Sequence, residues 1–257
     1  MMQASVLDGI PWANWIPAVI AAVASGGVAV WKSRTDLDTL RAQVAFKNED
    51  TLNSLQAKYV SPLRSSILTL SRRMREIELK FEHSQYGEVS GWFKTAKDHV
   101  VSDRRRADFR SWCYYEGTFA LSTVYYTGLY FKCVHDIYAH APFRELASAY
   151  SSDLERHLEQ VRDAFDWPDG GLWAPIQDVL GQRFMTALDD AGSAALSYRD
   201  MCELLDSQEP LKFGPFMRLL DVYWSTLRLA HAQAIRSELD NALAFINQHP
   251  LRGELRQ

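Results

Sequence analysis

The sequence predicts an all-α protein, with an N-terminal transmembrane helix followed by a multi-helix cytosolic bundle. Three observations predict this fold class. Residues 10–31 form an uncharged and mostly apolar run. Through most of the remaining chain, apolar residues recur at steps of three and four, which is the period of an amphipathic helix. No segment sustains the alternation of apolar and polar residues that is typical of a half-buried strand.

Total charge and cysteine usage narrow the class of protein. The net charge of −4 and the pI near 6.0 argue against a protein that coats nucleic acid through its global charge, although they are compatible with a local basic patch. Cys113, Cys133 and Cys202 are an odd number and contain no Cys-x-x-Cys motif. This usage is typical of reduced thiols in a cytosol rather than of a disulfide framework.

The uncharged run predicts a membrane anchor. A helix from Ile10 to Trp31 would be about 33 Å long, and the hydrocarbon core of a bilayer is about 30 Å thick. Trp12 and Trp15 lie near one end of the run and Trp31 ends it, so indole rings would fall at both headgroup layers. Two alternatives stay open. Residues 22–24 resemble the cleavage site of a signal peptide, although no basic residue precedes the run, and its prolines and glycines are compatible with a buried core helix.

Flanking charges predict the orientation of the anchor. No Lys or Arg precedes the run, whereas Lys32, Arg34, Arg41 and Lys47 follow it closely. Because basic flanks stay on the cytoplasmic side, we expect a single-pass protein with its N-terminus outside and its C-terminal domain in the cytoplasm. Gly26, Gly27 and the neighbouring Ala and Ser residues would let a second helix approach closely in lipid, which predicts a homo-oligomer.

The domain organisation follows from these patterns. Residues 1–32 are predicted to be the transmembrane anchor, residues 33–60 a helical stalk and residues 61–257 a cytosolic α-helical bundle. The stalk has apolar residues at helical steps, but this pattern is too short to predict a coiled coil. Ser61-Pro62, at the boundary, is predicted to be either a capped helix start or a kink.

Six or seven helices are predicted in the bundle. The first runs from this boundary to about residue 83 and ends before a break at residues 87–91. The others are predicted at about 102–138, 143–165, 176–189, 192–206 and 216–248, with the Pro-Asp-Gly-Gly turn in Asp166–Trp173 as the clearest loop. Gly117–Phe131 is a second uncharged stretch; it is short for a span, and a central helix buried on all sides explains it better.

Two arginine clusters are the candidate ligand-binding residues. The stretch "DRRRADFR" contributes Arg104, Arg105, Arg106 and Arg110, and an earlier helix contributes Arg72 and Arg73. Arg106 and Arg110 share a helix face, so their guanidinium groups could hold a phosphate together. If the clusters meet in space, the ligand would be a nucleotide, an RNA segment or anionic lipid headgroups. The alternative is a solvated surface paired with acidic residues.

No catalytic, metal or cofactor site is predicted. The sequence contains no P-loop, no Gly-x-Gly-x-x-Gly, no Gly-x-Ser-x-Gly and no His-Glu-x-x-His motif. Glu116 is considered as a buried carboxylate, for which an arginine partner on a neighbouring helix is the favoured explanation. His231 is expected to be a hydrogen-bonded core residue. The sequence therefore favours a protein without catalytic activity of its own.

Two stretches carry a resemblance. "KYVSPLRSSILTLSRRMREIE" (Lys58–Glu78), through Tyr59, Pro62, Leu63, Leu70 and Arg73, and "STVYYTGLYF" (Ser122–Phe131) resemble uncharacterised bacterial single-pass membrane proteins with a helical cytosolic domain. The resemblance covers about a third of the chain and implies architecture only. Membrane-anchored effectors of bacterial antiphage systems share this layout.

Together these features lead to two functional expectations. The first is a self-associating sensor, effector or interaction protein in the bacterial inner membrane, whose partners are the lipid bilayer, its own copies and a further protein. The alternative is a nucleotide- or RNA-binding helical domain, with nuclease activity as one form, that uses the arginine clusters.

Overall fold

The computed structural model describes residues 50–101, 109–139, 148–186, 194–206 and 214–249. The chain divides into two compact units, Met1–Thr51 and Leu52–Gln257, and the helices described below belong to the second. The predicted anchor lies outside the described residues, and with it Trp12, Trp15, Gly26, Gly27 and Trp31. Among the helices in the described ranges, none combines the length and the apolar character needed to cross a bilayer.

The second unit confirms the all-α, multi-helix prediction. Its α-helices are α2 (Ser61–Glu82), α3 (Tyr86–Val101), α4 (Phe109–Tyr114), α5 (Thr118–Ala139), α7 (Ser148–Phe165), α8 (Ala174–Arg183), α9 (Tyr198–Asp206), α10 (Gly214–Asp221) and α11 (Leu229–Gln248). Two π-helical segments, η1 (Gln56–Val60) and η3 (Val222–Thr226), adjoin α2 and α10. Strand pairing in the described part of the chain is limited to two residues on each side, where β1 (Met185–Thr186) runs antiparallel to β2 (Ala194–Ala195).

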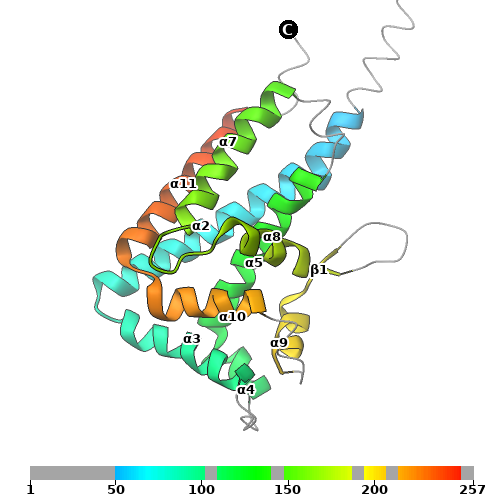
Figure 1. The fold of residues 1–257 in the computed structure, drawn as a ribbon. Coiled ribbons are helices and arrows are strands. Elements are labelled where there is room, and N and C mark those ends of the chain that lie inside the picture. Colours follow the sequence, from blue (N-terminus) through cyan, green and yellow to red (C-terminus); the bar gives the residue numbers. More distant parts are fainter. Residues whose placement is uncertain (1–49, 102–108, 140–147, 187–193, 207–213, 250–257) are drawn as a thin grey trace, which may run out of the picture. The chain divides into compact units, whose positions relative to one another are not determined.

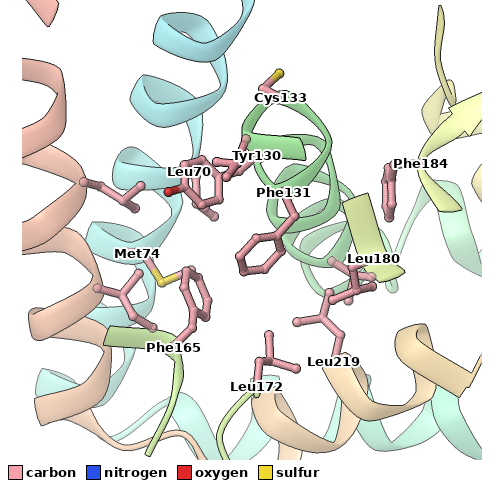
Figure 2. Packing of buried hydrophobic residues seen from close by; sticks show 14 of the residues in the cluster. Leu70, Met74, Tyr130, Phe131, Cys133, Phe165, Leu172, Leu180, Phe184 and Leu219 are labelled. Carbon is pink, nitrogen blue, oxygen red and sulfur yellow. The ribbon is translucent and has the colours of Figure 1, made fainter. Parts of the chain in front are cut away.

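Helices α2 and α5 pack against each other, and each is covered by further helices. The last helix, α11, packs against both α2 and α7, and the three run alongside one another (Figure 1). Helix α5 packs against α2 and α8, while α3 and α10 contact each other and α5. Aromatic and aliphatic side chains from these helices meet in one core. Figure 2 shows Met74, Phe131, Phe165 and Leu172 converging there, with the ring centroids of Phe131 and Phe165 5.2 Å apart and the ring planes at 63°.

Helix α5 is the buried central helix that its uncharged stretch predicts. Most of its side chains, including those of Val124 and Tyr130, are buried. The hydroxyl groups of Thr123 and Thr127 donate hydrogen bonds to the carbonyl oxygens of Phe119 and Thr123, at 2.7 and 2.8 Å. Because carbonyl oxygens of the helix accept from these threonines, a stretch rich in Thr can lie in the core. The buried hydroxyl of Tyr130 has no hydrogen-bond partner among the residues that the structure describes.

Two glycines allow α5 and α8 to approach closely. A Cβ atom at Gly128 would overlap the ring of Phe184, and one at Gly181 would lie 2.6 Å from the carbonyl oxygen of Phe131. Larger side chains at these positions would push the two helices apart.

An ionic cluster around one buried carboxylate joins α2 to α11. The carboxylate of Glu78 is enclosed, and it accepts hydrogen bonds from Arg75 at 3.0 Å and from Arg236 at 2.5 Å. In the same contact between the helices, the hydroxyl of Ser71 donates to Asp240 at 2.5 Å. A buried carboxylate needs such partners, so these pairs fix the register of the two helices.

The boundary at Ser61-Pro62 is a π-helical turn inside a continuous helix rather than a capped start. The backbone N–H of Ser61 bonds to the carbonyl oxygen of Gln56, and no side chain caps this point. Pro62 has no N–H and its ring crowds the preceding turn, so the wider turn at η1 lets the helix pass through it. Part of the predicted stalk contributes to the core, since Leu52, Leu55, Tyr59 and Val60 are buried.

The break predicted at residues 87–91 is wrong. Helix α3 runs through Gly87 and Gly91, where the cost of each glycine is offset by a buried stripe that includes Val89 and Phe93. The chain turns earlier. Ser84 adopts a φ of 58°, and the N–H groups of Ser84 and Gln85 bond to Phe81 and Lys80, as in a Schellman helix ending.

Two predicted long helices are also wrong. In the described part of the predicted helix 102–138, the turn at Tyr115–Gly117 separates α4 from α5, and its glycine lies against the ring of Trp112. The predicted helix 216–248 divides into α10, η3 and α11, because Leu227 and Arg228 are extended. Thr226 donates to Gly170 at 3.1 Å, which ties this break to the loop at Asp166–Trp173, a loop that the structure confirms.

Candidate functional site

Three of the six predicted ligand-binding arginines are in the described ranges, and the structure does not bring them together as one exposed cluster. Arg104, Arg105 and Arg106 lie outside those ranges. Arg73 is enclosed between α2 and α5, where it donates to Ser122 at 2.9 Å, pairs with Glu76 at 2.9 Å and lies 4.4 Å above the ring of Phe119. Its neighbour Arg72 is exposed. Adjacent helical residues point in directions about 100° apart, so only Arg72 of this pair is available to a ligand.

Arg110 and two tyrosines form an exposed surface at α4. The side chain of Arg110 is 67% exposed and lies 3.9 Å from Glu203, which Arg199 also contacts at 3.0 Å. Tyr115 is 77% exposed, and Tyr114 is also exposed. This surface begins directly after the predicted cluster Arg104–Arg106 in the sequence. It combines guanidinium groups with aromatic rings, both of which bind nucleic acids.

Beneath this surface, two cysteines meet where α4 packs against α9. Cys113 of α4 is 0% exposed and Cys202 of α9 is 3% exposed, and both are free thiols. A hydrogen bond between the two thiol groups is the main cause of the shifts in both of their pKa values. We call this pair the α4–α9 dithiol. A third residue, Tyr198, donates from its hydroxyl to the carbonyl oxygen of Cys113 at 2.9 Å and also hydrogen-bonds the thiol of Cys202.

The two thiols of the α4–α9 dithiol differ in acidity. The hydrogen bond with Cys113 lowers the pKa of Cys202, and the hydrogen bond with Tyr198 acts in the same direction. The pKa of Cys113 is raised, first by its hydrogen bond with Cys202 and then by burial. A thiolate at Cys202 would therefore receive a hydrogen bond from the thiol of Cys113, which keeps its proton.

Aromatic packing holds α4 in place around the dithiol. The imidazole of His99, on α3, stacks on Phe109 with ring centroids 3.4 Å apart, and Phe109 stacks in turn on Trp112. His99 also lies 3.5 Å from Asp206 at the end of α9. Within the described ranges, no three His, Cys, Asp or Glu side chains are placed to hold a metal ion.

Two single-residue expectations can be compared with the structure. Glu116 is exposed, so the idea of a buried functional carboxylate there is wrong. His231 is half-buried and stacks on Trp167, with centroids 4.2 Å apart; its Nδ1 atom has no hydrogen-bond partner among the residues that the structure describes. It is a packing residue, but the expected hydrogen bond of that atom is not found.

Sequence reasoning did not find the dithiol. Cys113 and Cys202 are far apart in the chain, and no spacing motif links them. The pairing depends on the packing of α4 against α9, which periodicity does not predict.

Comparison with known proteins identifies no relative. No protein-family model matches the chain, and no curated protein or solved structure is significantly similar to it. The functional argument therefore depends on the residues and their geometry.

Proposed function

We propose that this chain is a membrane-anchored helical protein of the bacterial inner membrane, acting as a sensor, effector or interaction protein without a catalytic site of its own. In this proposal residues 10–31 form a single span, with the N-terminus outside and the bundle in the cytoplasm. One observation carries it. Residues 10–31 carry no charge over a length that matches the hydrocarbon core of a bilayer, and tryptophans lie at both ends of this run.

Other features support the assembly and the role. The small residues around Gly26 and Gly27 would allow anchors from several chains to pack closely, which supports a homo-oligomer. The layout is that of membrane-anchored effectors of bacterial antiphage systems, which supports an effector role by analogy.

Membrane extraction tests the anchor. We expect the full chain, expressed in bacteria, to stay in the membrane pellet after alkaline carbonate treatment and to float with vesicles in a density gradient. Replacing Val19 and Val23 by lysine should release most of the protein, because each charge near the centre of a span costs about 3 kcal/mol. The matched control is Leu79→Lys with Val179→Lys, which places the same charges at partly exposed positions of the bundle.

The outcomes separate the alternatives for residues 10–31. Wild-type protein in the carbonate supernatant would contradict the span. Pelleting without flotation would identify aggregated protein and also count against it. A shortened N-terminus in the recovered chain would identify a cleaved signal peptide. For sidedness, a membrane-impermeant maleimide should label a Ser5→Cys variant in intact cells and a Gln257→Cys variant only after permeabilisation.

The α4 surface supports a second candidate function, the binding of single-stranded RNA. Two exposed tyrosines beside Arg110 offer stacking surfaces next to a basic run, the combination that binds single strands with little sequence preference. We expect the quadruple change of Arg104, Arg105, Arg106 and Arg110 to alanine to weaken binding of fluorescent oligouridylate. It should also reduce the slope of log affinity against log salt by about 3.

Matched variants make this test specific. Tyr115→Ala should weaken RNA binding by about 1–3 kcal/mol, whereas Trp173→Ala, at another exposed aromatic residue, should leave it unchanged. Binding that survives the quadruple change would remove the α4 surface as the RNA site.

A further inference from the structure

We propose that Cys113 and Cys202 are a reversible oxidation site, at which hydrogen peroxide or an organic hydroperoxide converts the α4–α9 dithiol to a disulfide. This site is independent of the membrane anchor and of RNA binding. It would join two short helices, α4 and α9, by a covalent bond.

The packing of α4 and α9 carries the proposal. The two thiols come from different helices, and both are buried where α4 packs against α9. Tyr198 lies one helical turn before Cys202 and bonds to both cysteines, to the backbone of one and to the thiol of the other. These contacts hold the two side chains toward each other, which is the first requirement for a disulfide.

The chemistry assigns different roles to the two cysteines. Cys202 is the attacking residue, because a hydrogen bond from the Cys113 thiol favours its thiolate. Its sulfur attacks one peroxide oxygen, the O–O bond breaks, and the leaving oxygen takes a proton to form water. Cys202 is then a sulfenic acid.

Cys113 resolves this intermediate. Its sulfur attacks the sulfur of Cys202 and forms the S–S bond, and the sulfenic hydroxyl leaves as water with the proton of the Cys113 thiol. In total, two thiols and one hydrogen peroxide give one disulfide and two waters, so the protein is oxidised by two electrons and the peroxide is reduced by two. A dithiol reductant reverses the change by thiol–disulfide exchange.

Burial sets how the oxidant reaches the site. Both thiols are almost fully enclosed, so oxidation proceeds through local opening. Helix α4 has six residues, Phe109–Tyr114, and a helix that short is not stable by itself in water. It is held by the side chains of Phe109, Trp112 and Cys113, and its release exposes both sulfur atoms together.

The third cysteine provides an internal control. Cys133 on α5 is also buried, but its thiol hydrogen-bonds Ser66 instead of another cysteine, and burial raises its pKa to about 11. A difference in oxidation rate between the dithiol and Cys133 is therefore caused by the pairing of the two cysteines and not by burial alone.

Oxidation of the purified full chain in detergent tests the proposal. The protein is treated with hydrogen peroxide for increasing times, alkylated with N-ethylmaleimide in denaturant, digested and analysed by mass spectrometry. We expect an intramolecular Cys113–Cys202 cross-link to form at least tenfold faster than Cys133 is oxidised, where oxidation of Cys133 is measured as the loss of its N-ethylmaleimide adduct. The cross-link should disappear with dithiothreitol. Because the three cysteines are compared within the same wild-type chain, the result does not depend on whether a variant folds.

Single variants then assign the roles. Cys133→Ser should leave the cross-link unchanged. Cys113→Ser should stop the reaction at a sulfenic acid on Cys202, which dimedone traps, whereas Cys202→Ser should abolish both products. Oxidation of all three cysteines at one rate would overturn the proposal, and so would cross-links between chains in place of the Cys113–Cys202 bond.

Discussion

The burial of the Cys133 thiol makes the stability of the fold depend on pH. Burial in α5 raises its pKa from 9.0 to about 11, although the hydrogen bond with Ser66 acts in the opposite direction. In the unfolded chain the thiol titrates near its ordinary value. Between these two values the unfolded chain loses a proton that the folded chain keeps. The contribution of this thiol to the free energy of unfolding is therefore fully present below about pH 9, and it is lost as the pH rises through about 11.

We expect this thiol to lower the free energy of unfolding by about 2 kcal/mol between pH 9 and pH 11. The Cys133→Ala variant lacks the titrating group, so its stability should decline less over the same range. Urea denaturation of both proteins at pH 8 and pH 11 measures the difference. The buried Tyr130 and Tyr223, whose pKa values are also raised by burial, are present in both proteins and cancel. Equal declines would contradict the assignment.

Individual site residues were predictable only in part. The sequence singles out Arg72 and Arg73 by type, yet it does not say that Arg73 reaches Ser122 and Phe119, which belong to another helix. The same limit applies to Cys113 and Cys202. Local periodicity tells which face of a helix is buried, but not which distant helix covers that face.

At the scale of elements, the contact of α5 with α8 depends on the absence of one side chain. A Cβ atom at Gly181 would lie 2.6 Å from the backbone oxygen of Phe131, which cannot rotate away. We expect Gly181→Ala to destabilise the fold by about 1–3 kcal/mol, because the two helices must separate. The midpoint of urea denaturation measures the change.

Gly91 is the matched control for this substitution. It lies inside α3, and a Cβ atom added there would meet no neighbouring side chain or helix within 4 Å. Gly91→Ala should therefore stabilise the protein by about 0.5–1 kcal/mol through helix propensity alone. If both alanines shifted the midpoint in the same direction, close helix packing at Gly181 would not be the cause.

Elements were predictable where the signal is local. The stripe of α2 and the Pro-Asp-Gly-Gly loop match the structure closely, because each depends on neighbours in the sequence. The end of α2 at Glu82 is close to the predicted residue 83, but the turn beyond it was predicted at residues 87–91 instead of at Ser84, and the break at Leu227 was missed. One uses Ser84 in a left-handed conformation that glycine usually takes, and the other is fixed by Thr226 reaching the loop that contains Gly170.

At the scale of the whole molecule, the all-α class was predictable because the helical period repeats along most of the chain. The order in which the helices pack was not. Helices α2 and α11 lie near opposite ends of the bundle's sequence, yet they are neighbours joined through Glu78 and Arg236. Their charged side chains are common surface types, and nothing in their spacing identifies them as partners.

The packing of α11 against the earlier helices α2 and α7 has a consequence for biosynthesis. Helices α2 and α7 are translated well before α11, the helix that covers both. The bundle therefore closes only after α11 has been synthesised. A ribosome stalled before residue 229 would hold a chain with two bare apolar helix faces, the form that chaperones bind and proteases degrade.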